Sequence, residues 1–318
     1  MTNVSLLDLQ SSVIDPSAFE KLEDYFLVCQ TLLELFESTR PTRIISPTDY
    51  KYLFYQYGEE YGHKITRPIN ADLFIEAPRD FRAAFERFES FLEDVRMYQD
   101  ASGQQQRLNQ YCLTNEVNKV VYTIQQSIGC IGDSFENPNQ SRKRIGQLFE
   151  LFVRTIIQKL GLDCESRSIN IPIPGFDDYT MSYELDLVIS RDKAMITAES
   201  SIIHPAEIIG SVKTTSKDRI DKVFLDKYML TKLLGRDIPV IAIFLHDVQR
   251  AKKGNSIFGV NSTFKSNHFL GYTVLLNKLD GVYYVDPNPV MTENARLQEQ
   301  IWDFQRFLVR DLWLLTKR

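Results

Sequence analysis

Two segments decide the fold of this chain: residues 182–190 have the sequence SYELDLVIS, and residues 206–245 have the sequence AEIIGSVKTTSKDRIDKVFLDKYMLTKLLGRDIPVIAIFL. Apolar and polar residues alternate in the first segment, which predicts a strand over 182–190. The second segment predicts a strand over 206–213, a helix over 216–235 and a buried strand over 239–245, because its apolar spacing changes from alternate to helical to continuous. This succession indicates an α/β (α+β) core with a mixed sheet.

The flanking segments extend this core in both directions. The sequence KRIGQLFELFVRTIIQKL at 143–160 predicts an amphipathic helix. A strand at 167–173 and a turn rich in Pro, Gly and Asp at 174–178 are expected to follow it. Beyond the core we expect a hairpin around Leu-Asp-Gly at 279–281, between YTVLLNK and VYYVDP, and then a long amphipathic helix over 293–315.

The N-terminal part has a different character. Residues 1–135 are predicted to be mainly helical, because wide apolar stripes recur at helical spacing; the expected helices span 17–38, 79–99 and 115–128. The stretch 41–78 is rich in Pro and Tyr, and its pattern predicts neither a helix nor a strand. The turn-rich sequence GDSFENPNQSRK at 132–143 indicates a boundary. We therefore expect two regions, 1–135 and 136–318.

Composition places the chain among globular proteins. Hydrophobic residues make up 43% and charged residues 25% of the 318 residues, as is usual for a globular chain that buries a core. No apolar run reaches the length of a membrane span, and the first residues have neither a basic leader nor a long apolar core. The widely spaced cysteines favour neither a zinc site nor a disulfide framework. The expected location is the cytoplasm, with no membrane partner.

Charge is unevenly distributed along the chain. The net charge of −5 argues against a protein that coats nucleic acid without specificity, but a sequence-specific enzyme needs positive charge only along its cleft. Residues 211–236 hold seven Lys and Arg against three Asp, a local net charge of +4. Further basic clusters occur at 142–144 and 250–253. Each cluster alone is also compatible with an ordinary solvated face.

Two carboxylates are expected on one face of the strand at 182–190. Successive side chains of a strand point to opposite faces, so Glu184 and Asp186 share one face. The other face is expected to hold Tyr183, Leu185, Leu187 and Ile189. Neighbouring carboxylates repel unless a cation lies near them, and Mg²⁺ takes oxygen ligands of this kind. The alternative is an exposed edge strand whose acids are solvated.

A lysine at the end of the next strand supplies the second element of a catalytic centre. Lys213 ends a largely apolar strand, 27 residues after Asp186. An ammonium group in this position can approach a phosphate without being fully buried. Phosphodiester cleavage needs a metal ion to activate water, and a nearby cation stabilises the charge that develops on the phosphate. An acid and a lysine on neighbouring strands therefore favour a metal-dependent nuclease.

A charged triplet follows this lysine. Thr215, with Asp218 three residues later, predicts a capping box at the start of the helix over 216–235. Lys217, Asp218 and Arg219 would then lie in its first turn. Lysine and arginine pair with guanine, and a carboxylate accepts from cytosine N4, so the triplet suits adjacent C and G bases. The alternative is an ordinary capped helix with charged residues at its start.

The segment SVKTTSKDR, followed by the acid Asp226, resembles a known group of enzymes. It is similar to the type II restriction endonucleases of the PD-(D/E)xK superfamily that recognise CCGG-, CCNGG- or CCWGG-type sites. In that group the second carboxylate lies on the helix, 13 residues after the lysine, as Asp226 does here, and Ser211 occupies the more usual acid position. The resemblance covers residues 142–245. Departures are Leu185 before the acid, Asp226 in place of glutamate, and Lys217 where arginine is commoner.

The resemblance implies roles for individual residues. Asp186 and Asp226 would bind Mg²⁺, and Lys213 would lie at the scissile phosphate. The triplet Lys217, Asp218 and Arg219 would bind DNA bases. An additional acid is common on a preceding helix, and it is expected to be Glu150, with Glu184 and Glu207 as alternatives that could support the metal site.

The resemblance also implies a fold and an activity. The fold would be a restriction-endonuclease-like mixed β-sheet core, at 136–318, flanked by helices. The enzyme would be a type II site-specific deoxyribonuclease that uses Mg²⁺ to hydrolyse double-stranded DNA at a short palindromic site with a CC/GG core. A homodimer or homotetramer would match the palindrome. A cognate DNA methyltransferase is expected as a genetic partner and not as a bound one.

Other functions remain open or are disfavoured by the sequence. The four histidines have no metal-ligand spacing such as HExxH, and the chain lacks both a GxSxG elbow and a GxxxxGK[ST] phosphate loop. The alternatives are a non-catalytic DNA-binding protein on a nuclease fold and a repair or recombination nuclease without site preference. A purely structural helical protein is the remaining one.

Overall fold

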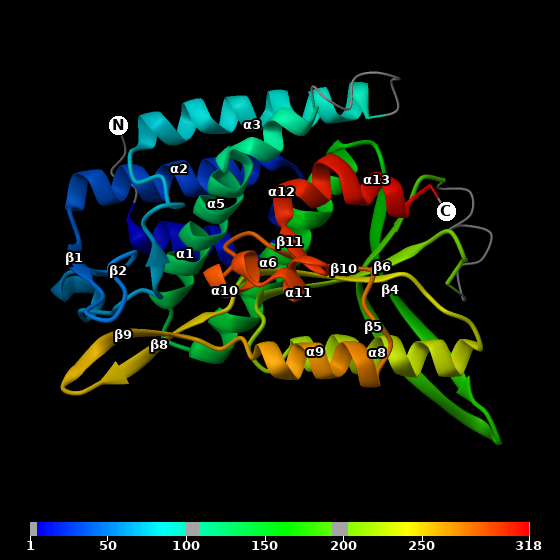
Figure 1. The fold of residues 1–318 in the computed structure, drawn as a ribbon. Coiled ribbons are helices and arrows are strands. Elements are labelled where there is room, and N and C mark those ends of the chain that lie inside the picture. The colour runs from blue at the N-terminus through cyan, green and yellow to red at the C-terminus, as the bar shows by residue number, and fades with distance from the viewer. Residues whose placement is uncertain (1–4, 100–107, 193–202, 318) are drawn as a thin grey trace.

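A mixed sheet forms the centre of the structure, a computed structural model that describes residues 5–99, 108–192 and 203–317 (Figure 1). Within those residues the sheet has six strands. In spatial order they are β11 (Ile301–Asp303), β10 (Gly281–Tyr284), β7 (Val240–His246), β6 (Ile208–Thr215), β5 (Phe176–Ser190) and β4 (Asp163–Ile173). Strands β11, β10, β7 and β6 are parallel, whereas β5 is antiparallel to both β6 and β4. The predicted α/β fold with a mixed sheet is confirmed.

Helices cover both faces of this sheet, as the alternation along β7 shows. Ile241 and Ile243 belong to one hydrophobic cluster, and Ala242 and Phe244 belong to another. The first cluster includes residues of α1 (Leu6–Ile14), α2 (Leu22–Thr39), α3 (Pro78–Tyr98), α5 (Glu116–Asp133) and α6 (Pro138–Lys159). The second includes residues of α8 (Ile220–Leu234), α9 (Ser266–Leu275), α10 (Pro289–Glu293) and α11 (Ala295–Gln298). The sheet is therefore the middle layer of three.

The Pro- and Tyr-rich stretch 41–78 forms a small antiparallel sheet. Its strands are β1 (Thr42–Ile45), β2 (Tyr52–Gln56) and β3 (Ile69–Asn70). The hairpin of β8 (Val248–Lys253) and β9 (Ser256–Ser262) packs against it, with Phe54 and Val260 in one cluster (Figure 1). Asn70 Nδ2 also donates to Asp286, just after β10, at 2.9 Å. The small sheet thus lies at the carboxyl ends of the central parallel strands.

Most of the predicted elements are present, with shifted ends. The predicted helices 79–99, 115–128 and 143–160 correspond to α3, α5 and α6, and that at 17–38 to the short helix η1 (Pro16–Ala18) followed by α2. The short helices η2 (Glu59–Tyr61) and η3 (Gln110–Leu113) lie in loops between the N-terminal elements. Strands β4 to β7 agree with the prediction to within a few residues, except that β4 and β5 start earlier and form a long hairpin. The periodicity therefore located the central core correctly.

The predicted hairpin around residues 279–281 is wrong. The sequence before it belongs to helix α9, and β10 pairs in parallel with both β7 and β11. Short apolar runs do not distinguish a strand from a helix. In α9, Phe269 is buried, whereas Val274 and Leu275 are exposed.

The predicted continuous helix over 293–315 is also wrong. The chain forms α11, the edge strand β11, α12 (Phe304–Arg306), the π-helical turn η4 (Phe307–Asp311) and α13 (Leu312–Leu315). New helical starts are capped by side chains: Asn294 accepts from Leu297 N, and Asp303 accepts from Arg306 N. Pairing of β11 with β10 competes with the helical pattern, and this pairing cannot be recognised from local periodicity.

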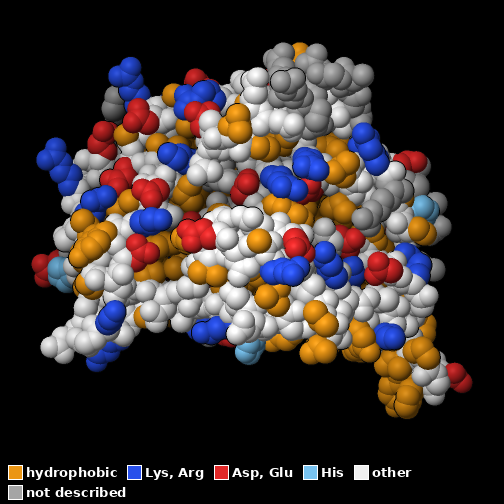
Figure 2. All heavy atoms as spheres, in the orientation of Figure 1, with side chains coloured by type: hydrophobic (Ala, Val, Ile, Leu, Met, Phe, Trp, Pro, Cys, Tyr) orange, Lys and Arg blue, Asp and Glu red, His pale blue; other side chains and the backbone are white. Residues whose placement is uncertain are grey.

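The β4–β5 hairpin projects beyond the sheet (Figure 1). Figure 2 shows hydrophobic side chains gathered over its projecting end, where Phe176 and Tyr179 are 61% and 66% exposed. Their rings meet edge to face with centroids 6.4 Å apart.

Among the described residues, every helix is too short or too polar to span a membrane.

Candidate active site

Asp186 lies at an irregularity of strand β5. Between the pairs Glu165↔Val188 and Arg167↔Leu185, β4 advances two residues and β5 three. This bulge breaks the simple alternation. The sequence predicted Leu185 and Leu187 on one face, but Leu185 packs in the cluster under α8 and Leu187 in the cluster under α6. Bulges of this kind change the direction of a side chain next to active sites.

The Asp186 carboxylate is held by strand β6. Its Oδ2 atom accepts from the backbone N of Val212 at 2.9 Å and from Ser211 Oγ at 3.3 Å. Lys213 Nζ also donates to the same oxygen. Arg154 of α6 donates from Nη2 to the backbone oxygen of Asp186 at 3.5 Å. The other carboxylate oxygen, Oδ1, accepts no hydrogen bond from the described residues, so it is the one available to a ligand.

Lys213 bridges Asp186 to Glu150. Its Nζ atom lies 3.0 Å from Glu150 Oε1, and α6 brings this glutamate to the sheet. Burial lowers the pKa of Lys213, but the Asp186 and Glu150 charges outweigh it and raise the pKa overall. Burial and the Asp186 charge raise the pKa of Glu150, and Lys213 opposes them. The ammonium group therefore stays protonated between two carboxylates.

Asp226, on helix α8, faces a first pocket beside the sheet. It lines this pocket together with Asp186 and Lys213, and its side chain is half-buried. Burial raises the pKa of the Asp226 carboxyl; Lys222 lowers it, and the charge of Asp186 raises it further. Asp226 and Glu150 thus lie within electrostatic range of Asp186 from two different helices.

Glu184 and Glu207 have other surroundings. Glu184 is solvent-exposed at the rim of the pocket. Glu207 is fully buried and pairs with Arg167 through two hydrogen bonds of 2.9 and 2.8 Å. A buried carboxylate engaged on both oxygens has no oxygen free to contact a metal ion, so Glu207 has a structural position just before β6.

The charged triplet forms a turn before α8, so the predicted capping box is wrong. Helix α8 begins at Ile220 without a side-chain cap, and Asp218 has a left-handed backbone with φ = 50°. A residue with a left-handed backbone cannot belong to the first turn of a right-handed helix. Lys217 Nζ donates to Gln249 Oε1 of β8 at 2.6 Å, and Arg219 lines the pocket that contains Asp186.

A second pocket adjoins the first and shares Lys213 and Arg219 with it. Arg142 and Lys143 of the predicted basic cluster line it, together with Arg67 from the N-terminal region. Neither Arg67 nor Arg154 was predicted from the sequence. Arg154 lies four residues after Glu150, one helical turn away on the same face, and this spacing could have indicated it. Nothing in the sequence around Arg67 indicates such a position.

The donor set fits a hard divalent cation. Within residues 5–99, 108–192 and 203–317, no three side chains of His, Cys, Asp and Glu form a ready-made metal cluster. Mg²⁺ is commonly bound by one or two carboxylates, the rest of its shell being water and substrate phosphate oxygens. Asp186 with Asp226 or Glu150 provides such a pair, and the Asp186 charge already disfavours ionisation of both neighbours.

Comparisons with known proteins support the fold. The type IIP restriction endonuclease Kpn2I has a crystal structure that aligns over 97% of both chains, with 17% sequence identity and a TM-score of 0.68. A complex of restriction endonuclease PspGI with substrate DNA aligns over 73% of this chain and 93% of that one, with 13% identity and a TM-score of 0.39, too low to support an argument. No protein-family model and no curated protein sequence matches the chain. The chain therefore has the restriction-endonuclease-like fold that the resemblance implied.

Proposed function

We propose that this protein is a type II restriction endonuclease that hydrolyses double-stranded DNA at a short palindromic site with a CC/GG core. The observation that supports this most is the cluster of Glu150, Lys213 and Asp186 on a restriction-endonuclease-like fold. Two acids and a lysine meet where α6, β5 and β6 come together, beside two adjoining pockets. This is the equipment that phosphodiester hydrolysis requires.

The residues of the cluster have separate roles in this proposal. Asp186 and Asp226 would hold Mg²⁺, and Glu150 would support the metal site. When bound, the ion supplies Lewis-acid stabilisation of the phosphate and makes water a better nucleophile. Lys213 keeps its proton and donates hydrogen bonds to the phosphate, where negative charge accumulates as water attacks phosphorus and the bond to the sugar oxygen breaks. Ser211 and the backbone of Val212 keep Asp186 oriented.

Base recognition is assigned to the turn before α8. Lys217, Asp218 and Arg219 precede a helix whose body is anchored in the core, so their side chains are presented from a rigid support. Cations in this turn suit guanine, and the carboxylate suits cytosine N4. A palindromic site implies a homodimer or homotetramer, and a cognate methyltransferase would protect the host DNA.

Incubation of the purified protein with lambda DNA tests the proposal. We expect discrete fragments with Mg²⁺, no cutting in EDTA, and loss of cutting in Lys213→Ala, by about a hundredfold or more. Sequencing of the fragment ends gives the site. Intact DNA in all conditions, including added CCGG and CCNGG duplexes, would indicate a non-catalytic DNA-binding protein, and a smear would indicate a nuclease without site preference.

A further inference from the structure

The second pocket, which we call the basic pocket, has an excess of positive charge. Its charged lining residues are Arg67, Arg142, Lys143, Lys213 and Arg219, with Glu150 as the acid. Lys213 is already neutralised by two carboxylates. Arg142, Lys143 and Arg219 form no ion pair with any described residue, and Arg142 and Lys143 are exposed. Three uncompensated cations on one side of the proposed catalytic lysine attract an anion to that side.

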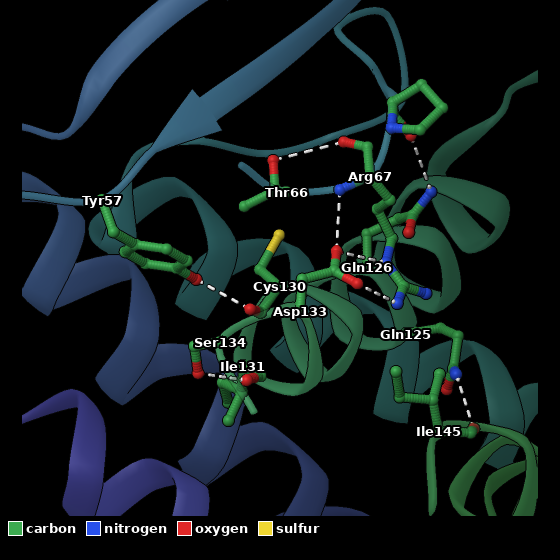
Figure 3. A network of polar contacts seen from close by, with 11 residues as sticks. Tyr57, Thr66, Arg67, Gln125, Gln126, Cys130, Ile131, Asp133, Ser134 and Ile145 are labelled. Carbon is green, nitrogen blue, oxygen red and sulfur yellow. Dashed lines mark hydrogen bonds and ion pairs between the residues drawn. The ribbon is translucent and has the colours of Figure 1, made fainter. Parts of the chain in front are cut away.

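Arg67 is held in this pocket by Asp133, at the end of α5 (Figure 3). Its Nε and Nη2 atoms donate to the two carboxylate oxygens at 2.9 and 2.8 Å, and its backbone N donates at 2.7 Å. A Cβ atom at Gly129 would lie 2.5 Å from Arg67 Nε, so only glycine lets the side chain lie against the helix. Nη1 forms no hydrogen bond with the described residues and remains available.

The surroundings place this guanidinium near the carboxyl end of the parallel strands. Burial and the Arg67 charge lower the pKa of His246, the last residue of β7, to about 3. His246 pairs with Thr215, which also lines the basic pocket. The ion pair with Asp133 fixes the orientation of Arg67 and leaves one donor edge free, which is the arrangement of a pre-organised phosphate ligand.

We propose that the basic pocket binds the DNA backbone phosphates next to the phosphate that is cut, with Arg142 and Lys143 as charge contacts and Arg67 as an oriented donor from the N-terminal region. This inference rests on the proposed function and extends it. It assigns a DNA contact to a part of the chain outside the resemblance at 142–245.

Gly146 offers a test that does not damage the fold. It lines the basic pocket on α6, and a Cβ atom added there meets no heavy atom within 4 Å. Glycine is also unfavourable inside a helix, so a side chain at this position does not weaken α6. Gly146→Glu places a negative charge in the pocket, and Gly146→Gln adds almost the same volume without charge.

The measurement is the affinity for a fluorescently labelled DNA duplex, by anisotropy in EDTA over a range of KCl concentrations. We expect Gly146→Glu to weaken binding about tenfold or more and Gly146→Gln to weaken it much less. Arg142→Ala with Lys143→Ala should reduce the slope of log affinity against log salt by about 2. Arg67→Lys should weaken binding by about threefold or more, because the second donor edge is lost together with the bidentate contact to Asp133.

Each outcome bears on a different statement when wild-type cutting in Mg²⁺ is measured in parallel. A wild-type protein that neither binds nor cuts DNA would overturn both the proposed function and the basic pocket. In another outcome the wild-type protein cuts DNA, while Gly146→Glu and the Arg142/Lys143 variant both bind DNA with the affinity and salt slope of wild type. That result would overturn the phosphate-binding role of the basic pocket and leave the proposed function standing. Equal losses in Gly146→Glu and Gly146→Gln would show a steric effect and contradict the phosphate role. Wild-type binding by Arg67→Lys would reduce Arg67 to a structural residue.

Discussion

At the scale of single residues, acids of similar appearance in the sequence have different environments. Glu150 contacts Lys213, whereas Glu207 is buried against Arg167 just before β6, at the end of the strand away from the lysine. Both were candidates to support a metal site, and only the surroundings separate them. Both oxygens of Glu207 are bonded to Arg167, so we expect this acid to have a structural role. Glu150 shares Lys213 with Asp186, so its carboxylate can also bind another cation.

Removal of the buried acid should therefore destabilise the protein. In Glu207→Gln the Arg167 guanidinium, 8% exposed, loses its buried charged partner, and we expect the free energy of unfolding to fall by about 3 kcal/mol. Arg167 also contacts Glu165, whose side chain is 45% exposed, so Glu165→Gln is the matched control with an expected loss of under about 1 kcal/mol. Urea unfolding of both variants measures the difference, and equal losses would contradict this account.

A second buried acid predicts a pH dependence. Asp286 accepts from Asn70, and burial raises the pKa of its carboxyl to about 7. From about pH 4 to 7 the unfolded chain is ionised here and the folded chain is protonated, so stability falls as pH rises through this window and levels off above it. Asp286→Asn removes this loss. Relative to wild type, the variant should gain on the order of 2 kcal/mol between pH 5 and pH 8.

Denaturant unfolding at the two pH values measures this gain. Asp72→Asn, a change at an exposed carboxylate in the loop after Asn70, is the control and should leave the pH dependence of wild type unchanged. A constant difference between Asp286→Asn and wild type at pH 5 and pH 8 would show that the Asp286 carboxyl does not titrate in this range.

At the scale of elements, irregular backbone positions shape the candidate site. The bulge in β5 directs Asp186 towards the lysine strand, and the turn at 217–219 sets the charged triplet ahead of α8. Both features interrupt regular elements at the candidate site. Regular strands and helices hold these interruptions in place, because their apolar faces are anchored in the two clusters on either side of the sheet.

The left-handed Asp218 provides a test of the turn. Asparagine adopts this conformation readily and retains the shape of the side chain, whereas a β-branched residue does not. We expect Asp218→Asn to keep the melting temperature of wild type and to alter the preference of cutting at C·G pairs, because the carboxylate acceptor is lost. Asp218→Val should lower the free energy of unfolding by about 1–2 kcal/mol. Calorimetry and sequencing of cut ends measure the two effects, and an unchanged site in Asp218→Asn would exclude base contact by this residue.

At the scale of the whole molecule, the N-terminal region and the sheet share one core. A single hydrophobic cluster includes Leu9, Phe88, Phe149, Ile243 and Leu312, from the first helix to the last. The N-terminal region also reaches the carboxyl ends of the parallel strands: Asn70 donates to Asp286, and Arg67 lines the basic pocket beside the candidate site. We therefore propose that residues 1–135 and 136–318 differ in role and do not form separate folding units.

A shared core predicts that both regions unfold together. Differential scanning calorimetry of the full chain should show one transition, with a calorimetric enthalpy equal to the van't Hoff enthalpy. Val121→Ala, in the middle of α5, should lower the melting temperature of that single transition without splitting it. Two separable transitions, one of them insensitive to Val121→Ala, would show that the regions are independent domains.

The sequence by itself determined strands β4 to β7, helices α6 and α8 that pack on them, and the candidate residues for the proposed chemistry. Burial of one face imposes a period of two on strands and 3.6 on helices, and such periods are visible locally around Asp186, Lys213 and Glu150. For the same reason the fold class was predictable without any partner or ligand.

Only the tertiary structure decided which of these residues meet. The approach of Glu150 to Lys213, the bulge at Asp186, the buried pairing of Glu207 and the place of Arg67 all depend on contacts between segments far apart in the chain. The failed predictions have the same cause, since β10 and β11 are defined by their neighbours in the sheet and not by their own spacing. Local periodicity records which face of an element is buried, but packing between elements selects what lies against that face.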